Sequence, residues 1–355
     1  MSFLRLSSVK KTYPDGTVAV KGVDLDVKDG EFVVLLGPSG CGKTTTLRMV
    51  AGLETCSAGK IELAGVDVTS LRPSQRDVGF VFQFYALYPH LSVRENVAFP
   101  LRCAGVRVAE IHARVDQVCE RVGISPLLTR YPAELSGGDR QRVALARAMV
   151  RRPRVYLMDE PLGTLDADQR LEMCEFIRAQ QQELGVTTLY VTHDQEEAMS
   201  IADRIVVMVD GNIRQIGSPT GVYDDPADLF VAGFVGSPGM NLIDGAVERR
   251  EGRPVFVPKR SPLALPLPME GDSGPATLGI RPEYVHANAH GPLGGVVVLD
   301  EYLGSHRFVH VETREGRIVM RSNQPHPPGS TVSLGLDLTH CRLFDGLSGR
   351  SRAHV

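Results

Sequence analysis

Hydrophobic and polar positions alternate with two different periods up to about residue 234. Strand-like alternation covers residues 3–28, broken by Pro14-Asp15-Gly16, and predicts two antiparallel strands joined by a turn. Further strands are predicted by short runs at 59–63 and 66–68, and by unbroken apolar runs at 32–36, 78–82, 155–159 and 187–192. Helical spacing is found at 47–51, 92–124, 143–150 and 167–184. Strands and helices thus mix in this part of the chain, which indicates an α/β fold.

The pattern changes after Phe234. Gly236-Ser237-Pro238-Gly239 is typical of a linker, so we expect one domain over residues 1–235 and another over 236–355. Short alternating runs separated by Gly and Pro then predict a small β-barrel. These runs lie at 246–248, 255–257, 276–280, 296–299, 307–311, 318–321 and 331–334.

Composition narrows the class of protein. With 355 residues, 43% of them hydrophobic and 23% charged, the chain can bury a large core and form two domains. A net charge of −3 gives no general electrostatic reason to bind nucleic acid. We find no apolar run long enough to span a bilayer and no signal-peptide pattern, so we expect a cytosolic chain unless a partner holds it at a membrane. The six cysteines lack Cys-x-x-Cys spacing and are expected to be reduced thiols.

A phosphate-binding pattern follows the apolar run at 32–36. Gly37, Gly40, Gly42, Lys43 and Thr44 fill the P-loop template in order. Glycines let the backbone curl so that its N–H groups point inward, and a helix starting near Lys43 adds the partial positive charge of its N-terminus. Lys43 would then reach the β- and γ-phosphates, and the Thr44 hydroxyl would bind Mg²⁺. The alternative is a glycine-rich turn that holds no ligand.

Polar residues follow three other predicted strands. The run at 155–159 ends in Asp159 and Glu160, whose side chains should point in opposite directions because successive strand residues alternate. Asp159 fits second-shell or water-mediated Mg²⁺ binding, and Glu160 fits the general base that polarises a hydrolytic water. Gln83 and His193 come at the ends of the other two strands, at the sheet edge where ligands bind. Gln83 could reach Mg²⁺ or the attacking water. His193 could hydrogen-bond the γ-phosphate.

A second candidate anion site lies at residues 135–142, Leu-Ser-Gly-Gly-Asp-Arg-Gln-Arg. Ser136 is a natural helix N-cap, and Gly137 and Gly138 leave backbone N–H groups uncovered at a helix N-terminus. One chain has little use for two anion sites so far apart in sequence. We therefore expect the second site to face a nucleotide bound to another copy.

Three further features of the sequence each allow two interpretations. Tyr13 could stack on a purine base or be an ordinary strand tyrosine. Residues 84–91 carry more apolar surface than a loop usually exposes, which fits a docking site for another chain or packing onto the helices that follow. The tail has histidines that could form a metal site, although no Cys-x-x-Cys or carboxylate cluster accompanies them, namely His286, His290, His306, His310, His326 and His340 beside Cys341.

These motifs, in this order and spacing, resemble the nucleotide-binding subunit of an ABC transporter. The run Gly37, Pro38, Ser39, Gly40, Cys41, Gly42, Lys43, Thr44 and Thr45 is similar to the Walker A loop. Gln83 resembles the Q-loop, Leu135 to Asp139 the ABC signature, 155–159 with Glu160 the Walker B strand and catalytic glutamate, Leu165-Asp166 the D-loop, and His193 the switch histidine. Tyr13 then matches the adenine-stacking A-loop. The signature is the specific element, since Walker motifs are shared with kinases, GTPases and helicases.

The resemblance implies a mechanism that uses two chains. Two cassettes associate head to tail, and Ser136 and Gly138 of one close over the γ-phosphate held by Lys43 of the other. ATP and Mg²⁺ are the implied cofactors, with Thr44, Gln83 and Asp159 as the implied metal ligands. Two positions depart from the family pattern. Asp139 stands where the family usually has Gln, and Gly163-Thr164 replaces the commoner small-polar pair of the D-loop.

Resemblance also extends to the tail. Ser237-Pro238 with Met240-Asn241, the run 279–283 (Gly-Ile-Arg-Pro-Glu), and Glu301 with Leu303-Gly304 resemble the OB-like, TOBE-type C-terminal domain of importers of the maltose and glycerol-3-phosphate type. The implied fold is a P-loop ABC cassette with a mixed core sheet, an antiparallel β subdomain and a helical subdomain at about 90–150, followed by an all-β regulatory domain.

The resemblance implies partners and a location. We expect a second ATP-binding subunit, forming a homodimer, together with transmembrane permease subunits, an indirectly coupled extracytoplasmic solute-binding protein, and no nucleic acid. The location would be peripheral, on the cytoplasmic face of the cell membrane. An importer of polyamine or iron is the alternative, then a soluble ABC ATPase acting on DNA or ribosomes. A P-loop kinase or an inert regulatory module fits less well, because the signature argues against the first and Glu160 with His193 against the second.

Overall fold

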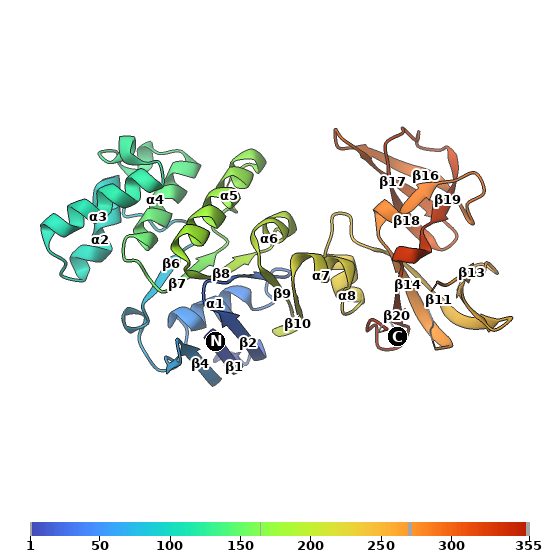
Figure 1. The fold of residues 1–355 in the computed structure, drawn as a ribbon, viewed down its shortest axis with the longest axis horizontal. Coiled ribbons are helices and arrows are strands. Elements are labelled where there is room, and N and C mark those ends of the chain that lie inside the picture. Colours follow the sequence, from blue (N-terminus) through green and yellow to red (C-terminus); the bar gives the residue numbers. More distant parts are fainter. Residues whose placement is uncertain (1, 164, 269–271, 353–355) are drawn as a thin grey trace. The chain divides into compact units, whose positions relative to one another are not determined.

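The chain divides into two compact units, Met1–Pro219 and Thr220–Val355, each with a hydrophobic core of its own. The computed structural model describes residues 2–163, 165–268 and 272–352. In these ranges every helix is either too short or too polar to cross a membrane. Figure 1 shows helices α1 to α6 and the parallel strands in the first unit, and two short helices with antiparallel strands in the second.

The first unit begins with an antiparallel sheet of order β2-β1-β4-β5. Its strands are β1 (Ser2–Thr12), β2 (Val18–Lys28), β4 (Ala58–Leu63) and β5 (Val66–Asp67). The apolar members of the predicted alternation point into the core, as Leu4, Leu6 and Val9 on β1 do, while their polar neighbours face outward. The antiparallel β subdomain predicted from the sequence is therefore confirmed.

A six-stranded mixed sheet of order β10-β9-β3-β8-β7-β6 forms the centre of this unit. Its strands are β3 (Phe32–Leu36), β6 (Val78–Val81), β7 (Val155–Asp159), β8 (Thr187–Thr192), β9 (Arg204–Val209) and β10 (Asn212–Gly217). All but β10 run parallel. Every residue of β3, β7 and β8 is buried, which explains why these strands read as unbroken apolar runs. Parallel strands end at the same edge of a sheet, so the residues that follow β3, β6, β7 and β8 gather there.

The helices of this unit pack in three places. Helix α1 (Lys43–Ala51) packs against β7 and β8 and shares its apolar core with the antiparallel sheet. Helices α5 (Ala167–Leu184) and α6 (Gln195–Ile201) pack against each other. Helices α2 (Val93–Cys103), α3 (Val108–Arg121) and α4 (Gly137–Met149) pack together as a helical layer at one end of the unit (Figure 1). Ser92, Ser136, Asp166 and Asp194 are the N-caps of α2, α4, α5 and α6, each accepting a hydrogen bond from a backbone N–H of the first turn.

The predicted helical stretch at 92–124 is interrupted in the structure. Helix α2 ends at Cys103, and the chain turns through Gly105, whose φ of +69° lies in the left-handed region, before α3 begins at Val108. Short 3₁₀ turns occur at 73–75, 125–127 and 132–134. The spacing of apolar residues fits both α2 and α3, but the break between the two helices depends on Gly105.

The second unit is built from two five-stranded antiparallel sheets and two short helices. Helices α7 (Pro219–Asp224) and α8 (Leu229–Phe234) precede the strands. One sheet has the order β13-β12-β11-β14-β20, with β11 (Asn241–Arg250), β12 (Arg253–Pro258), β13 (Leu265–Pro266), β14 (Gly274–Ile280) and β20 (Arg342–Asp345). The other has the order β15-β19-β16-β17-β18, with β15 (Val285–Ala287), β16 (Leu293–Tyr302), β17 (Arg307–Thr313), β18 (Gly316–Ser322) and β19 (Thr331–Leu336). Further 3₁₀ turns lie at 282–284 and 338–340. The predicted all-β second domain is confirmed.

A buried arginine holds α7 and α8 to the sheets of this unit. Arg281 is only 2% exposed and follows β14 directly. Its guanidinium lies 3.9 Å from the centre of the Tyr223 ring and donates hydrogen bonds to the carbonyls of Tyr223 (2.6 Å), Ala232 (3.3 Å) and Val235. Burial lowers the pKa of Arg281. The two helices therefore belong to the second compact unit, while the domain boundary predicted between 235 and 236 stays a prediction.

We predict that Arg281→Ala loosens α7 and α8. The substitution leaves three buried carbonyls without their donor, and hydrogen bonds from a charged group are each worth about 1.5–3 kcal/mol. Amide hydrogen exchange over residues 220–240 should therefore become at least about tenfold faster. Arg253→Ala, at an exposed position of β12, is the matched control and should leave these rates unchanged. Equal rates in the two variants would contradict the role given to Arg281.

Candidate functional site

The loop between β3 and α1 forms a tight cradle. Gly42 has a φ of +100°, and a Cβ placed on it would lie 2.5 Å from the carbonyl oxygen of Ala19. A Cβ on Gly37 would lie 2.2 Å from the carbonyl oxygen of Met208. Any larger residue at either position would force the backbone apart. A cavity of about 180 Å³ opens above the loop and is lined by Ala19, Ser39, Gly40, Gly42, Lys43, Thr44, Thr45 and Glu160.

Lys43 is buried in this cradle without a carboxylate partner among the described residues. Its side chain is 4% exposed, and its Nζ donates to the carbonyls of Gly37 (2.7 Å) and Pro38 (3.0 Å). The same Nζ lies 3.8 Å from the Cys41 sulfur, although burial dominates there and raises the pKa of the Cys41 thiol. A buried ammonium is costly when only neutral groups surround it. The cradle is therefore suited to an anion, with α1 offering its N-terminus to the same ligand.

Asp159, at the end of β7, is joined to the cradle through Thr44. The Thr44 hydroxyl donates to Asp159 Oδ1 at 2.7 Å, and Arg48 Nη2 lies 3.8 Å from Asp159 Oδ2. Asp159 is 3% exposed, and burial raises its pKa above the usual value. This pair supplies only oxygen ligands, the kind that Mg²⁺ prefers.

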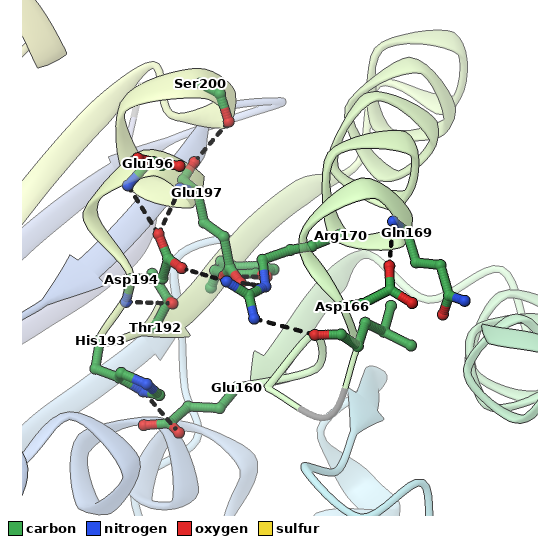
Figure 2. A network of polar contacts seen from close by, with 12 residues as sticks. Glu160, Asp166, Gln169, Arg170, Thr192, His193, Asp194, Glu196, Glu197 and Ser200 are labelled. Atoms are coloured by element: carbon green, nitrogen blue, oxygen red, sulfur yellow. Dashed lines mark hydrogen bonds and ion pairs between the residues drawn. The ribbon is translucent and has the colours of Figure 1, made fainter. Parts of the chain in front are cut away.

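Glu160 is the next residue along but makes a different set of contacts. Its φ of +44° is unusual for a residue with a side chain. Its Oε2 accepts a hydrogen bond from Gln83 Nε2 at 3.2 Å and lies 3.1 Å from His193 Nδ1. Figure 2 shows the His193 contact. The ends of β6, β7 and β8 thus bring Gln83, Glu160 and His193 together beside the cavity.

Arg170, on α5, connects the segments that follow β7 and β8. Its Nη1 donates to Asp194 Oδ2 at 2.8 Å, and its Nη2 donates to the carbonyl of Leu165 at 3.1 Å (Figure 2). Its Nε lies 3.6 Å from Glu197, which is 5% exposed and accepts a hydrogen bond from the Tyr190 hydroxyl. Burial raises the pKa of Glu197. Arg170 therefore ties the turn after Glu160 to the helix cap after His193.

The remaining predicted residues lie outside this cluster. Tyr13 is partly exposed, with Lys11 Nζ 4.9 Å from the centre of its ring, and it does not line the cavity at the cradle. Asp166 is the N-cap of α5, where it accepts from the Gln169 N–H at 2.9 Å. Thr164 lies outside the described residues.

The signature segment forms a cavity of its own. Ser136 and Gly137 are exposed at the start of α4, and Gly138 and Asp139 are partly exposed. A cavity of about 200 Å³ there is lined by Ser136, Gly138, Asp139, Arg142, Leu165, Gln169, Glu172 and Met173. It shares no lining residue with the cavity at the cradle. Within one chain the two predicted phosphate-binding segments line separate cavities.

Residues 84–91 are partly packed and partly exposed. The carbonyls of Tyr85 and Ala86 accept hydrogen bonds from Arg147 of α4, and the Tyr88 ring lies 4.5 Å from that of Phe99. Phe84 is 77% exposed. A neighbouring groove of about 380 Å³ runs between β6 and the helical layer and is lined by apolar side chains that include Phe80, Phe82, Ala86, Tyr88, Phe99 and Pro100.

Sequence reasoning missed Arg170, Arg48 and Ala19. The residues that Arg170 joins are 5 and 24 positions away along the chain, so no motif marks it. In the tail, the described residues include no group of three or more His, Cys, Asp or Glu side chains placed to hold a metal.

Comparisons with known proteins agree with this geometry. The chain matches the family model of the ABC transporter over residues 20–163, the MalK OB fold domain over 236–285 and the TOBE domain over 278–344. It is 45% identical to the sn-glycerol-3-phosphate import ATP-binding protein UgpC of Paraburkholderia xenovorans, with 99% of each chain covered. It is also 45% identical to the trehalose/maltose import ATP-binding protein MalK of Thermococcus litoralis, with 99% of this chain and 100% of that protein covered.

Solved structures also resemble the first unit. A dimeric ATP-binding cassette, MJ0796, in a post-hydrolysis state with ADP and Pi, matches with a TM-score of 0.56 and 31% identity over 61% of this chain and 98% of that one. CbiO1 of Clostridium perfringens, part of an ABC transporter complex, matches with a TM-score of 0.59 and 32% identity over 62% of this chain and 90% of that one.

We predict that Arg170→Met lowers both stability and turnover. Methionine keeps much of the length but removes every donor, so Asp194, Glu197 and the Leu165 carbonyl lose their partner, at a cost of about 2–4 kcal/mol. Turnover of bound nucleotide should fall at least about fivefold even in the fully folded fraction, because Glu160 and His193 lose their common brace. Thermal unfolding and kcat are the measurements.

Arg121→Met is the control for this prediction. Arg121, the last residue of α3, pairs at 2.7 Å with Glu183 of α5, whose side chain is 55% exposed, so loss of this pair should cost less than about 1 kcal/mol. An Arg170→Met protein with the stability and kcat of Arg121→Met would show that the brace has no role.

Proposed function

Because this chain belongs to the ABC transporter family, we propose that it is the ATP-hydrolysing subunit of an import complex, in which nucleotide-driven pairing of two such subunits powers the uptake of a solute. The observation that carries the proposal is the Glu160 carboxylate, held by Gln83 and His193 beside the cavity at Lys43. An ATP γ-phosphate bound to Lys43 would lie next to a carboxylate able to take a proton from water.

In this proposal the cradle from Gly37 to Thr45 binds the triphosphate. Lys43 exchanges its two carbonyl partners for phosphate oxygens, which removes the cost of its buried charge. Thr44 and Asp159 would hold Mg²⁺, with Gln83 near enough in the cluster to join them. Bound there, the metal would neutralise charge on the phosphate oxygens. His193 would hydrogen-bond the γ-phosphate, and Tyr13 would stack on the adenine.

The proposal further needs a second copy of the chain. Ser136, Gly137 and Gly138 line or border a separate cavity, and their amides are at the positive end of α4. Supplied by a partner copy, they would cover the γ-phosphate held by Lys43, with Asp166 at the cross-dimer contact. The 31% identity to a cassette whose solved structure is dimeric supports a homodimer.

The apolar groove between β6 and the helical layer is the proposed contact with the permease. Its aromatic lining and the exposed Phe84 suit an apolar helix or loop on the cytoplasmic side of a transmembrane subunit. Gln83 lies two residues after β6, next to the groove residue Phe82, and is bonded to Glu160, so a shift at the groove would reach the hydrolytic site. The protein would then be peripheral, on the cytoplasmic face of the membrane, and an extracytoplasmic solute-binding protein would be coupled only indirectly.

We propose that residues 1–235 are the nucleotide-binding domain, with its helical subdomain at about 90–150, and that 236–355 form the TOBE-type regulatory domain. The matches at 236–285 and 278–344 support this division.

We predict that Glu160→Gln abolishes turnover and preserves ATP binding. The amide keeps the shape of the side chain but cannot accept a proton, and loss of a general base costs about 10²- to 10⁴-fold in kcat. The variant should remain paired in ATP, because hydrolysis no longer ends the paired state. Phosphate release, nucleotide binding and light scattering are the measurements.

Glu183→Gln, an exposed substitution, is the control and should behave like the unmodified protein. A Glu160→Gln protein that hydrolyses ATP at the normal rate would remove Glu160 as the base. One that binds ATP but stays monomeric, with the membrane subunits present, would remove the two-copy site.

The proposed solute is sn-glycerol-3-phosphate or a sugar such as maltose or trehalose, since relatives with these names cover 99% of the chain. In cells that lack the chromosomal copy, the unmodified protein should restore uptake of one of these labelled solutes, and Glu160→Gln should not. Restored uptake of putrescine or ferric iron instead would favour the polyamine or iron importer. Purification with nucleic acid or ribosomes and without hydrophobic subunits would favour a soluble ABC ATPase.

A further inference from the structure

The hydroxyl of Ser136 is already engaged within its own chain. Ser136 Oγ donates its hydrogen to Asp139 Oδ2 at 2.7 Å and accepts a hydrogen bond from the Asp139 N–H at 3.2 Å. A serine hydroxyl has one hydrogen to donate. Its bond to a carboxylate is charge-assisted and about twice as strong as one to a neutral acceptor. To donate to a phosphate, Ser136 must first leave Asp139.

The Asp139 carboxylate also lacks a neighbouring cation. In residues 2–163, 165–268 and 272–352, no Lys, Arg or His side chain lies within ion-pair distance of Asp139. The two arginines nearest in sequence are committed elsewhere. Arg142 Nη2 lies 2.7 Å from Glu172 Oε1, and Arg140 Nε donates to the carbonyl of Pro132 at 3.0 Å. The start of α4 therefore presents negative charge where the proposed function places the phosphates of a partner's ATP.

We propose that Asp139 is a positioning residue that restrains pairing of two ATP-loaded copies, by holding the Ser136 hydroxyl away from the γ-phosphate and by repelling that phosphate. This inference rests on the proposed function, in which Ser136 closes over ATP bound to the partner. Both contributions act against the paired state. In the separate subunit the same carboxylate stabilises α4, because negative charge is favourable at a helix N-terminus.

The chain contains a matched pair that performs the capping role alone. On α2, the N-cap Ser92 donates to Glu95 Oε2 at 2.8 Å and accepts from the Glu95 N–H at 3.3 Å, which repeats the two hydroxyl contacts of Ser136 with Asp139, and Glu95 Oε2 also accepts from the Ser92 N–H at 2.9 Å. Glu95 lies in neither cavity discussed above. Any effect of Asp139 that is due only to helix capping should therefore also appear when Glu95 is changed.

The experiment measures the ATP concentration at which half of the protein is paired. It compares Asp139→Asn, Asp139→Glu and Glu95→Gln, each in the full chain that also carries Glu160→Gln. Asp139→Asn should lower this concentration about threefold to tenfold, since it removes the charge and weakens the hold on Ser136. Asp139→Glu should keep the unmodified value, because a glutamate at this position can still bind the serine, as Glu95 does. Glu95→Gln should leave it unchanged.

Salt and the hydrolysis-competent protein provide two further readouts. The advantage of Asp139→Asn should shrink between about 50 mM and 500 mM NaCl, because part of it is electrostatic and screened by salt. With Glu160 restored, Asp139→Asn should lower the KM for ATP more than it changes kcat. A helix that is merely less stable would give neither result.

The possible failures are distinguishable. If the variant with Glu160→Gln alone never pairs in ATP, the proposed two-copy site is wrong, and the restraint assigned to Asp139 is wrong with it. If it pairs, but Asp139→Asn needs as much ATP or more, the restraint assigned to Asp139 is wrong. If Glu95→Gln shifts the midpoint as far as Asp139→Asn does, the effect is helix capping and the inference is overturned.

Discussion

A buried ammonium without a counter-charge is the constraint on which the rest of the site depends. Lys43 is 4% exposed and has only carbonyl partners, and no carboxylate among the described residues lies within ion-pair distance. A folded chain maintains such a charge only when the surrounding structure holds it there. Here β3 and α1 provide that support, and the left-handed glycine Gly42 lets β2 approach closely. The cost is recovered when an anion binds, so the cradle is pre-organised for phosphate.

The same sheet edge fixes the direction of every other functional group. Parallel strands β6, β7 and β8 end together, and their next residues meet because the strand ends do. Glu160 leaves β7 with a positive φ, which separates it from Asp159 and points it at Gln83 and His193. Arg170 then joins the two loops that follow β7 and β8. The two loops are therefore joined both by that guanidinium and by the Glu160–His193 contact.

Much of this could be predicted from the sequence. The fully buried strands can be recognised in the sequence as apolar runs, and the cradle can be recognised by its glycines at fixed spacing. Strand β9 is likewise an unbroken apolar run, Ile-Val-Val-Met-Val, and could have been predicted from that run. Strands β13 and β15 have two and three residues, too few to show any period. The contacts of Arg170 and Arg281 could not be predicted, because Arg170 binds residues on separate segments and Arg281 binds backbone carbonyls, which carry no side-chain signature.

Two buried groups at the cradle carry opposite charges. Lys43 is a buried cation with no carboxylate within ion-pair distance in the described part of the chain, and Asp159 is a buried anion whose pKa is raised by burial. They belong to different elements, α1 and β7, which are joined through the Thr44 hydrogen bond, the Arg48–Asp159 ion pair and packing. In the proposed function, a phosphate would satisfy the first charge and Mg²⁺ the second, so a ligand that combines both would relieve both costs. Binding free energy would then be concentrated at the junction of α1 and β7, and by linkage the ligand would stabilise this junction more than the distant parts of the unit. Glu160 lies one residue beyond that junction, and through Gln83 it contacts the segment that leads to the apolar groove. The proposed path from the cradle to the groove thus runs through Glu160 and Gln83, which are joined by one hydrogen bond.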